Sequence, residues 1–324
     1  MNVLMLYPSY PETFWGFQHA LKFISKKAAF PPLGLLTVAS LLPESWGKRL
    51  VDENTDPVQE SDWAFADMVF LSGMLIQREG IEKLLHQAKE RGKTVVAGGP
   101  AFMAEPENYP QVDHFVLDEA EITLPHFLRD LDQNRAKRMY TSKKRPNMSQ
   151  TPLPLWSLID VHKYATMPVQ FSRGCPFDCE FCDIFLLNGR KPRTKTPEQM
   201  VQEMHVLYDK GWRGSVFIVD DNFIGNKRRV KDMLPAVIEW QKEHDYPFTL
   251  LTEASVNLAK DTKLMDLMSW ANFNKVFLGL ETPCLESLQE CGKTQNTQID
   301  LSEAVRIIHQ HGMQVMGGFI VGFD

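Results

Sequence analysis

Three cysteines stand close together in the second half of the chain, and they are the residues best able to do chemistry. Cys175, Cys179 and Cys182 follow one another with C-x3-C-x2-C spacing, whereas residues 1–174 contain no cysteine. Thiolates are soft ligands for zinc and for iron–sulfur clusters, and thiols gathered in one loop are poorly placed for a disulfide framework. The spacing therefore predicts a metal-binding loop in a reducing compartment.

The loop offers three sulfur ligands and no fourth. The next histidine along the chain is His205, well beyond the loop. A structural zinc site usually has four protein ligands, whereas a cubane iron–sulfur cluster bound by three cysteines can present its fourth iron to a substrate. The ligand count favours a 4Fe-4S cluster, and a zinc site and a loop without metal stay open as alternatives.

The cysteine loop follows the first of five strand-like segments in the second half of the chain. Strands are predicted at residues 169–172, 216–219, 249–251, 276–280 and 315–321. Helix signals fill the gaps between them, such as the capping box of Thr196 and Gln199 before an apolar stripe. Repeated strand–helix units of this length predict a (β/α) barrel or part of one.

Acidic residues follow three of these strands. Asp220 and Asp221 come after the second strand, Glu253 ends the third and Glu281 ends the fourth. The carboxyl ends of the strands of a parallel barrel lie on one rim, so these carboxylates are expected near the cysteine loop. A helix-capping or surface acid remains the alternative for each residue taken alone.

The first half of the chain alternates short apolar strands with helices. Strands are predicted at residues 3–7, 49–52, 68–72, 94–97 and 115–117, and helices at 32–42, 78–91 and 124–131. This alternation is typical of an α/β doubly wound parallel sheet covered on both faces. We expect such a domain over residues 1–134, a basic, proline-rich and exposed linker over 135–160, and an incomplete (β/α) barrel over 161–324.

Composition narrows the classes of partner. The chain of 324 residues is 44% hydrophobic and has a formal net charge of −6, so no global positive field would attract nucleic acid. No apolar run approaches the ~18 residues that would span a bilayer, so no transmembrane segment is predicted. We expect a cytoplasmic protein in which Cys284 and Cys291 are buried or incidental thiols.

The cysteine loop resembles that of the radical S-adenosylmethionine (SAM) enzymes. The pattern C-x-x-x-C-x-aromatic-C, with Phe181 as the aromatic residue, follows a first barrel strand as it does in that family. The resemblance implies that the three cysteines hold a 4Fe-4S cluster and that its open iron binds SAM. It also implies a 5′-deoxyadenosyl radical that abstracts hydrogen, and an external electron donor of the flavodoxin or ferredoxin type.

The same resemblance implies roles for residues around the barrel. It places cofactor-binding side chains or backbone at Phe181, Asp220, Asp221, Glu253, Glu281, Gly318 and Gly322. The two aspartates would serve the SAM amino group, the two glutamates the ribose or methionine, and the glycines the adenine through a G-x-I-x-G-x-x-E pattern. The last Glu of that pattern would be residue 325, so we expect the chain to be truncated at its C-terminus.

The first half resembles the N-terminal domain of cobalamin-binding radical SAM enzymes. The likeness lies in turns after three strands, at Ser72, at Gly98-Gly99 and at Asp118-Glu119-Ala120-Glu121. It implies cobalamin at the carboxyl edge of the sheet, where glycine allows close approach of the backbone. The D-x-H-x-x-G loop that supplies a histidine ligand in many B12 proteins is absent, and ordinary tight turns remain the alternative.

Together these features predict a cobalamin-dependent radical SAM methyltransferase acting on an unactivated carbon of a small or lipid-like molecule. The segments Gln170–Cys175 and Val219–Asn226 are nearest to a subgroup similar to hopanoid C-2 methylase. A B12-dependent cyclase or rearrangement enzyme and a non-catalytic cofactor-binding fragment stay open. A methylthiotransferase is disfavoured, because those enzymes carry a second cysteine-bound cluster in a region that here has no cysteine.

Overall fold

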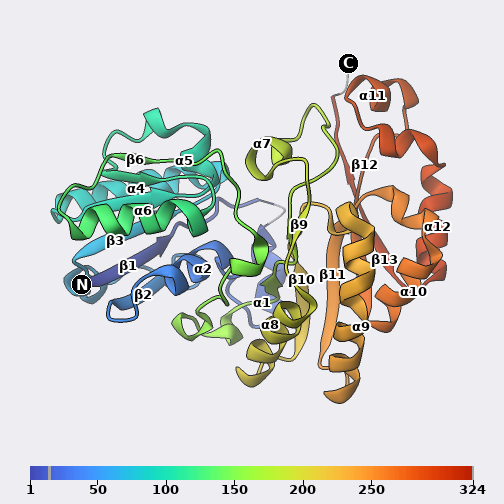
Figure 1. Cartoon of the computed structure of the whole chain (residues 1–324), viewed down its shortest axis with the longest axis horizontal. Coiled ribbons are helices and arrows are strands. Elements are labelled where there is room, and N and C mark those ends of the chain that lie inside the picture. Colours follow the sequence, from blue (N-terminus) through green and yellow to red (C-terminus); the bar gives the residue numbers. More distant parts are fainter. Residues whose placement is uncertain (14–15, 323–324) are drawn as a thin grey trace. The chain divides into compact units, whose positions relative to one another are not determined.

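The computed structural model describes residues 1–13 and 16–322. The chain divides into two compact units, each of which is shown in Figure 1. The first unit consists of Met1–Pro146 with Gln150–Ala165, and the second of Asn147–Ser149 with Thr166–Asp324. No helix in the described part of the chain is both long enough and apolar enough to cross a membrane.

The first unit contains a six-stranded parallel sheet with the order β2-β1-β3-β4-β5-β6. Its strands are β1 (Asn2–Tyr7), β2 (Gly47–Asp52), β3 (Met68–Ser72), β4 (Thr94–Gly98), β5 (His114–Val116) and β6 (Met139–Tyr140). Because β1 lies between β2 and β3, the strand order reverses direction there, as in flavodoxin-like sheets. The predicted parallel α/β sheet is confirmed.

Helices cover both faces of this sheet. They are α1 (Gln18–Phe23), α2 (Leu33–Leu41), α3 (Glu60–Phe65), α4 (Arg78–Glu90), α5 (Pro100–Ala104) and α6 (Ala120–Asp132). Side chains of β1 alternate between two cores: Leu4 and Leu6 pack with α4, whereas Val3 and Met5 pack with α2 and α6. This alternation explains why β1 reads as a continuous apolar run, since a strand buried on both faces has no polar side.

The segment expected to be an exposed linker is partly built into the first unit. β6 pairs with β5 as an edge strand, and the Tyr140 hydroxyl donates a hydrogen bond to Asp130 at 3.1 Å. Trp156 is fully buried. The structure differs from the expectation because the basic residues dominate the composition of this segment, while the few apolar side chains between them are the ones that pack.

The second unit contains a five-stranded parallel sheet with the order β13-β12-β11-β10-β7, and a two-stranded antiparallel pair, β8-β9. The strands are β7 (Met167–Val169), β8 (Ser172–Arg173), β9 (Arg193–Thr194), β10 (Gly214–Ile218), β11 (Phe248–Ala254), β12 (Phe273–Glu281) and β13 (Gln314–Phe319). Successive parallel strands that neighbour one another in chain order are the arrangement of a partial (β/α) barrel. Their carboxyl ends therefore share one edge.

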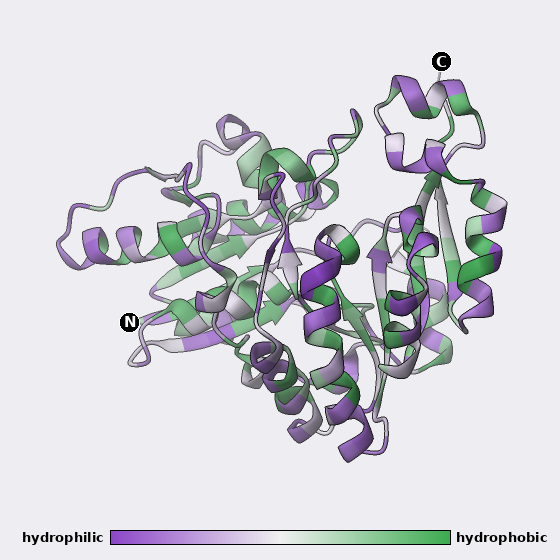
Figure 2. Ribbon diagram, turned by 45° about the vertical axis from the view of Figure 1, so that its right-hand side comes forward, coloured by the Kyte–Doolittle hydropathy of each residue, from purple (hydrophilic) through white to green (hydrophobic). Residues whose placement is uncertain are grey.

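Helices connect these strands. They are α7 (Ile184–Asn188), α8 (Pro197–Asp209), α9 (Lys227–Glu243), α10 (Thr262–Trp270), α11 (Leu285–Glu290) and α12 (Leu301–Gln310). Two helix N-caps predicted from the sequence are present in the structure. The Asp261 side chain accepts a hydrogen bond from the Leu264 N–H, and the Asp300 side chain accepts one from the Glu303 N–H. Figure 2 shows hydrophobic residues along the strands and polar residues on the outer sides of the helices.

Candidate functional site

The three cysteines lie in one tight loop between β8 and α7 of the second unit. Gly174 begins the loop with φ +103°, and a Cβ atom there would lie 2.8 Å from the Gly189 carbonyl oxygen. The Cys175 N–H donates to that same oxygen at 3.1 Å, and the Cys182 N–H donates to the Cys179 carbonyl at 3.0 Å. All three thiols are free, and only Cys179 of the three is buried. Glycine at position 174 thus lets the loop fold back on itself.

Each cysteine sulfur faces an N–H donor. The Asn222 amide nitrogen lies 3.7 Å from Cys175 Sγ, and the Gln295 amide nitrogen lies 3.6 Å from Cys179 Sγ. The Cys175 sulfur also accepts a hydrogen bond from the Phe177 backbone, and the Cys182 sulfur accepts one from the Ile184 backbone. Burial raises the pKa of the Cys175 and Cys182 thiols, and these hydrogen bonds oppose the rise. The loop therefore supplies polar support for sulfur atoms that carry negative charge.

Asp220 holds the chain segment that leads into the loop. Its carboxylate is fully buried and accepts hydrogen bonds from the Phe171 N–H at 2.8 Å and the Ser172 hydroxyl at 2.6 Å. Burial raises its pKa to about 7. We expected Asp220 to face a cofactor, but both of its oxygens are occupied by this segment. Its position makes it a support of the cysteine loop.

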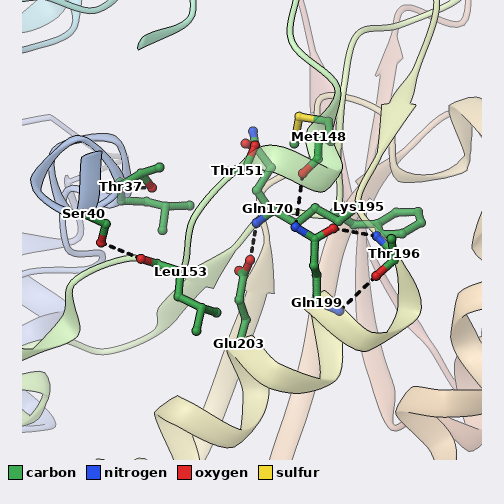
Figure 3. A network of polar contacts seen from close by, with 12 residues as sticks. Thr37, Ser40, Met148, Thr151, Leu153, Gln170, Lys195, Thr196, Gln199 and Glu203 are labelled. Carbon is green, nitrogen blue, oxygen red and sulfur yellow. Dashed lines mark hydrogen bonds and ion pairs between the residues drawn. The ribbon is translucent and has the colours of Figure 1, made fainter. Parts of the chain in front are cut away.

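A buried ion pair, Lys195–Glu203, lies beside the same segment, and Figure 3 shows both residues next to Gln170. Lys195 and Glu203 pair at side-chain exposures of 3% and 1%, and the Glu203 carboxylate also accepts a hydrogen bond from the Gln170 backbone. The Lys195 N–H donates to the Phe171 carbonyl at 2.8 Å. Burial raises the pKa of Glu203, although the Lys195 charge opposes the rise. The sequence analysis missed this pair, because Lys195 follows the short strand β9, which was not predicted, and Glu203 lies within a helix.

Asp221 and Glu253 lie at the carboxyl ends of β10 and β11 and are half-buried. Asp221 accepts a hydrogen bond from the Asn188 side chain at 3.1 Å, and burial raises its pKa. Burial raises the pKa of Glu253 to about 7, and the charges of Asp221 and Asp220 add to the rise. The three predicted carboxylates of these two strands are thus close enough to influence one another.

Glu281 ends β12 and forms a buried ion pair with Lys293. The pair lies against Gly279, where a Cβ atom would lie 2.6 Å from the Lys293 ammonium nitrogen in this arrangement. That nitrogen also lies 5.4 Å from the centre of the Phe181 ring, and Phe181 itself is 44% exposed. Lys293 therefore connects two predicted residues, Glu281 and Phe181, that belong to different loops.

Gln295 and Asn296 are buried polar residues that the sequence analysis did not identify. The Asn296 amide donates to the carbonyl oxygens of Gly279 and Leu280 at 2.9 and 3.1 Å. The side-chain carbonyl oxygens of Gln295 and Asn296 are buried without a hydrogen-bond partner among the described residues. Buried acceptors are rarely left unpaired, so these two oxygens are candidates for a contact with a polar ligand or water. Their segment follows a helix rather than a strand, which is why strand-end reasoning passed over it.

The remaining predicted residues of the second unit lie outside the loop. Gly318 pairs with Gly279 in the sheet, and a Cβ atom at Gly318 would lie 2.8 Å from the Phe277 ring. Gly322 has φ +104°. Cys284 is exposed beside Glu286, whereas Cys291 is buried with its thiol near the Leu288 carbonyl oxygen.

Contacts within the first unit explain why glycine stands at positions 98 and 99. A Cβ atom at Gly98 would lie 2.5 Å from the Val116 carbonyl oxygen. Gly99 has φ +94°, and a Cβ atom there would lie 2.5 Å from the Ser72 hydroxyl oxygen. These contacts require glycine whether or not a ligand approaches. A role for Ser72, Gly98 and Gly99 in binding cobalamin stays a prediction.

The donor set fits a cluster with several irons. No group of three or more His, Cys, Asp or Glu side chains in residues 1–13 and 16–322 could hold a single metal ion. In a cubane cluster each cysteine binds a different iron, so the sulfur atoms stand farther apart than around one zinc ion. Three free thiols in one loop, each facing an N–H donor, are compatible with that arrangement.

Known proteins resemble this chain in sequence. Residues 169–324 match the family model described as the Radical SAM superfamily. Over its full length the chain is 48% identical to an uncharacterized methyltransferase of Synechocystis sp., of which it covers 61%. Over its full length it is also 40% identical to hopanoid C-2 methylase of Rhodopseudomonas palustris, of which it covers 62%. The chain thus spans about three fifths of the length of these curated relatives.

A solved structure shares the fold. It is the radical S-adenosylmethionine methyltransferase TsrM from Kitasatospora setae with cobalamin and a [4Fe-4S] cluster bound. The TM-score is 0.77 at 14% sequence identity, and the match covers 99% of this chain and 69% of that one. At this identity the likeness concerns the fold.

Proposed function

We propose that this chain, whose residues 169–324 match the Radical SAM family model, works as a cobalamin-dependent radical SAM methyltransferase on an unactivated carbon. One observation carries the proposal: a loop of three free cysteines, each sulfur facing an N–H donor, at the carboxyl edge of a parallel sheet. The full-length similarity to proteins named as methyltransferases supports the reaction type.

Cys175, Cys179 and Cys182 would hold a 4Fe-4S cluster, which supplies an electron for the cleavage of bound SAM. Asp220 and the Lys195–Glu203 pair keep the loop in place. Breaking a buried ion pair leaves an uncompensated charge, which is costly, so this pair favours one course of the segment that leads into the loop.

SAM would contact the residues gathered around the cysteine loop. Asp221 and Glu253 offer carboxylate oxygens, and the unpaired carbonyl oxygens of Gln295 and Asn296 can accept hydrogen bonds from an amino or hydroxyl group. The Glu281–Lys293 pair presents both signs of charge beside Phe181. We propose Gly318 and Gly322 as the backbone that faces the adenine.

Cobalamin would bind the first unit at the carboxyl edge of its sheet, near Ser72, Gly98 and Gly99. Ligands of doubly wound sheets bind at this edge, beside the point where the strand order reverses. TsrM, which was solved with cobalamin bound, shares the fold of this chain. Cobalamin supplies the chemistry of methyl transfer when it is bound.

The proposal includes a small or lipid-like substrate, an external electron donor and a cytoplasmic location. One relative that matches this chain over the whole of its 324 residues is named a hopanoid C-2 methylase, which supports a lipid-like substrate. All five cysteines are free, as is usual for proteins in a reducing compartment.

The proposal is tested with anaerobically reconstituted protein, SAM, hydroxocobalamin and a low-potential reductant. We expect bound iron and sulfide, corrin absorption that stays with the protein on gel filtration, and SAM-derived 5′-deoxyadenosine. Protein that holds a cluster but forms no 5′-deoxyadenosine would contradict the radical reaction. With a hopanoid-type substrate, a product that is heavier by one methylene group supports methyl transfer, whereas an unmethylated ring-closed product would support the cyclase alternative.

A further inference from the structure

Asn222 is placed and oriented to donate to Cys175. It lies in the connection after β10, four positions beyond Ile218, and is 4% exposed. Its side-chain oxygen lies 3.3 Å from the Ser255 N–H and 3.4 Å from the Ser255 hydroxyl, so the amide nitrogen is the group that faces the sulfur. The Ser255 hydroxyl donates in turn to the Asn257 side chain at 2.8 Å. The loop after β11 thus fixes the orientation of an amide on the loop after β10.

Gln295 contacts Cys179, and it is held there by its segment rather than by a described partner of its side-chain oxygen. It is 5% exposed, and Cys179 is 7% exposed, so their contact is shielded from water. The segment that carries Gln295 is held to the end of β12 by the bonds from Asn296 to Gly279 and Leu280. The cysteine loop is tied to the neighbouring residues by the Glu180 N–H, which donates to the Cys291 carbonyl at 2.9 Å. Both sides of the amide–sulfur contact are therefore fixed.

An N–H group that points at a cluster sulfur stabilises negative charge on it. Reduction adds an electron to an iron–sulfur cluster and spreads part of the charge over its sulfurs, so such hydrogen bonds raise the reduction potential. The effect is larger where water is excluded, because a low local dielectric strengthens each dipole. Cys182 differs from the other two cysteines, since its donor is the backbone of Ile184. A side-chain donor can be removed by substitution, whereas a backbone donor cannot.

We propose that Asn222 and Gln295 are positioning residues that raise the reduction potential of a cluster held by the three cysteines. This inference rests on the proposed function. Neither amide needs to touch SAM for this role. Removing either donor is expected to make the cluster harder to reduce while leaving its three ligands in place.

The test uses the reconstituted protein and four variants, with the midpoint potential followed by EPR during a redox titration. Gln295→Met keeps the side-chain length and removes the donor, and Gln295→Glu replaces it by an acceptor. Asn222→Leu removes the second donor. Gln298→Leu, at an exposed position of the same turn, is the matched control. Iron content and thermal unfolding of each variant show whether fold and cluster are retained.

We expect the midpoint potential to become more negative in Gln295→Met, further so in Gln295→Glu, and to shift in the same direction in Asn222→Leu. Gln298→Leu should match the parent protein. Potentials unchanged in all the donor variants at normal iron content would overturn the inference, as would a parent protein that binds no cluster. A parent protein that binds the cluster but does not cleave SAM would refute the proposed function and still allow the potentials to decide this inference.

Discussion

The two units carry parallel sheets of the same kind, but the polar groups at their carboxyl edges are arranged differently. At the edge of the first unit the Tyr164 hydroxyl donates to Asp52 at 3.0 Å, and the Asn54 backbone and side chain donate to the same carboxylate. At the edge of the second unit the carbonyl oxygens of Gln295 and Asn296 have no such partner among the described residues. The Asp52 carboxylate is therefore satisfied by the fold, although Oε2 of the neighbouring Glu53 is also buried without a partner in the described part of the chain. In the second unit, by contrast, the unpaired oxygens belong to a segment that contacts the cysteine loop through Gln295.

The largest expected effect comes from breaking the cysteine edge itself. Cys179→Ala should remove one of the three ligands, abolish the cluster absorption and reduce 5′-deoxyadenosine formation below detection. Iron and sulfide analysis of anaerobic protein measures the first effect. Cys284→Ala, which removes an exposed thiol, is the control and should keep both properties. Equal cluster content in the two variants would contradict the ligand assignment.

The support of the cysteine edge should be the next most sensitive feature. Glu203→Gln leaves Lys195 buried and unpaired, which we expect to lower the free energy of unfolding by about 3–5 kcal/mol. Urea titration measures the change. Gln202→Ala, at an exposed position of the same helix, should change it by less than about 0.5 kcal/mol. Replacing both Lys195 and Glu203 by Met should recover part of the loss, because no buried charge is then left alone.

At the edge of the first unit, Asp52 should make the free energy of unfolding depend on pH. Burial raises its pKa from 3.8 to about 6, despite hydrogen bonds from Asn54 and Tyr164 that lower it. The folded protein therefore keeps this proton at a pH where the unfolded chain has lost it. The resulting stability is present in full below pH 4 and is lost as the pH rises through about 6.

Asp52→Asn should remove that dependence. Two pKa units correspond to about 3 kcal/mol, so the difference in unfolding free energy between parent and variant should change by roughly that amount between pH 4 and pH 7. Urea titrations at both pH values measure it. A difference that is the same at both pH values would show that Asp52 does not titrate between them.

The smallest expected effect concerns the turn after β4. Gly99→Ala places a Cβ atom 2.5 Å from the Ser72 hydroxyl oxygen at φ +94°, and should lower the free energy of unfolding by about 1–3 kcal/mol. Gly92→Ala is the comparison at a milder φ of +64°, where a Cβ atom would meet nothing within 4 Å. Gly99 has ψ −179°, a backbone region that other residues rarely adopt, so its larger expected loss combines backbone strain with the contact to Ser72. Thermal unfolding of both variants measures the difference, and equal losses would contradict it.

The sequence allowed prediction of the features that depend on local pattern. The spacing of Cys175, Cys179 and Cys182, the strand periodicity and the helix caps each involve residues near one another in the chain, and the structure has the strands and helices near where these patterns indicated. The order of the strands within the second sheet also follows from chain order, because neighbouring parallel strands are the usual result of repeated strand–helix units.

Contacts between distant segments could not be predicted in this way. Gln295 lies 116 positions from Cys179, and its flanking residues are uniformly polar, so nothing in the local pattern distinguishes it from a surface residue. Asp220 was identified from its strand-end position, but the direction of its side chain depends on Phe171 and Ser172 in another segment. Burial of Lys195 opposes the usual preference of lysine for water, and only its pairing with Glu203 explains it.

The side-chain hydrogen-bond donors of Cys175 and Cys179 come from loops that contribute no ligand of their own. Asn222 belongs to the connection after β10, and Gln295 to the connection between β12 and α12. Substitutions in those connections can therefore alter the electronic properties of the site while the three-cysteine sequence remains identical. Two homologous chains with the same cysteine motif need not share the same driving force for electron transfer.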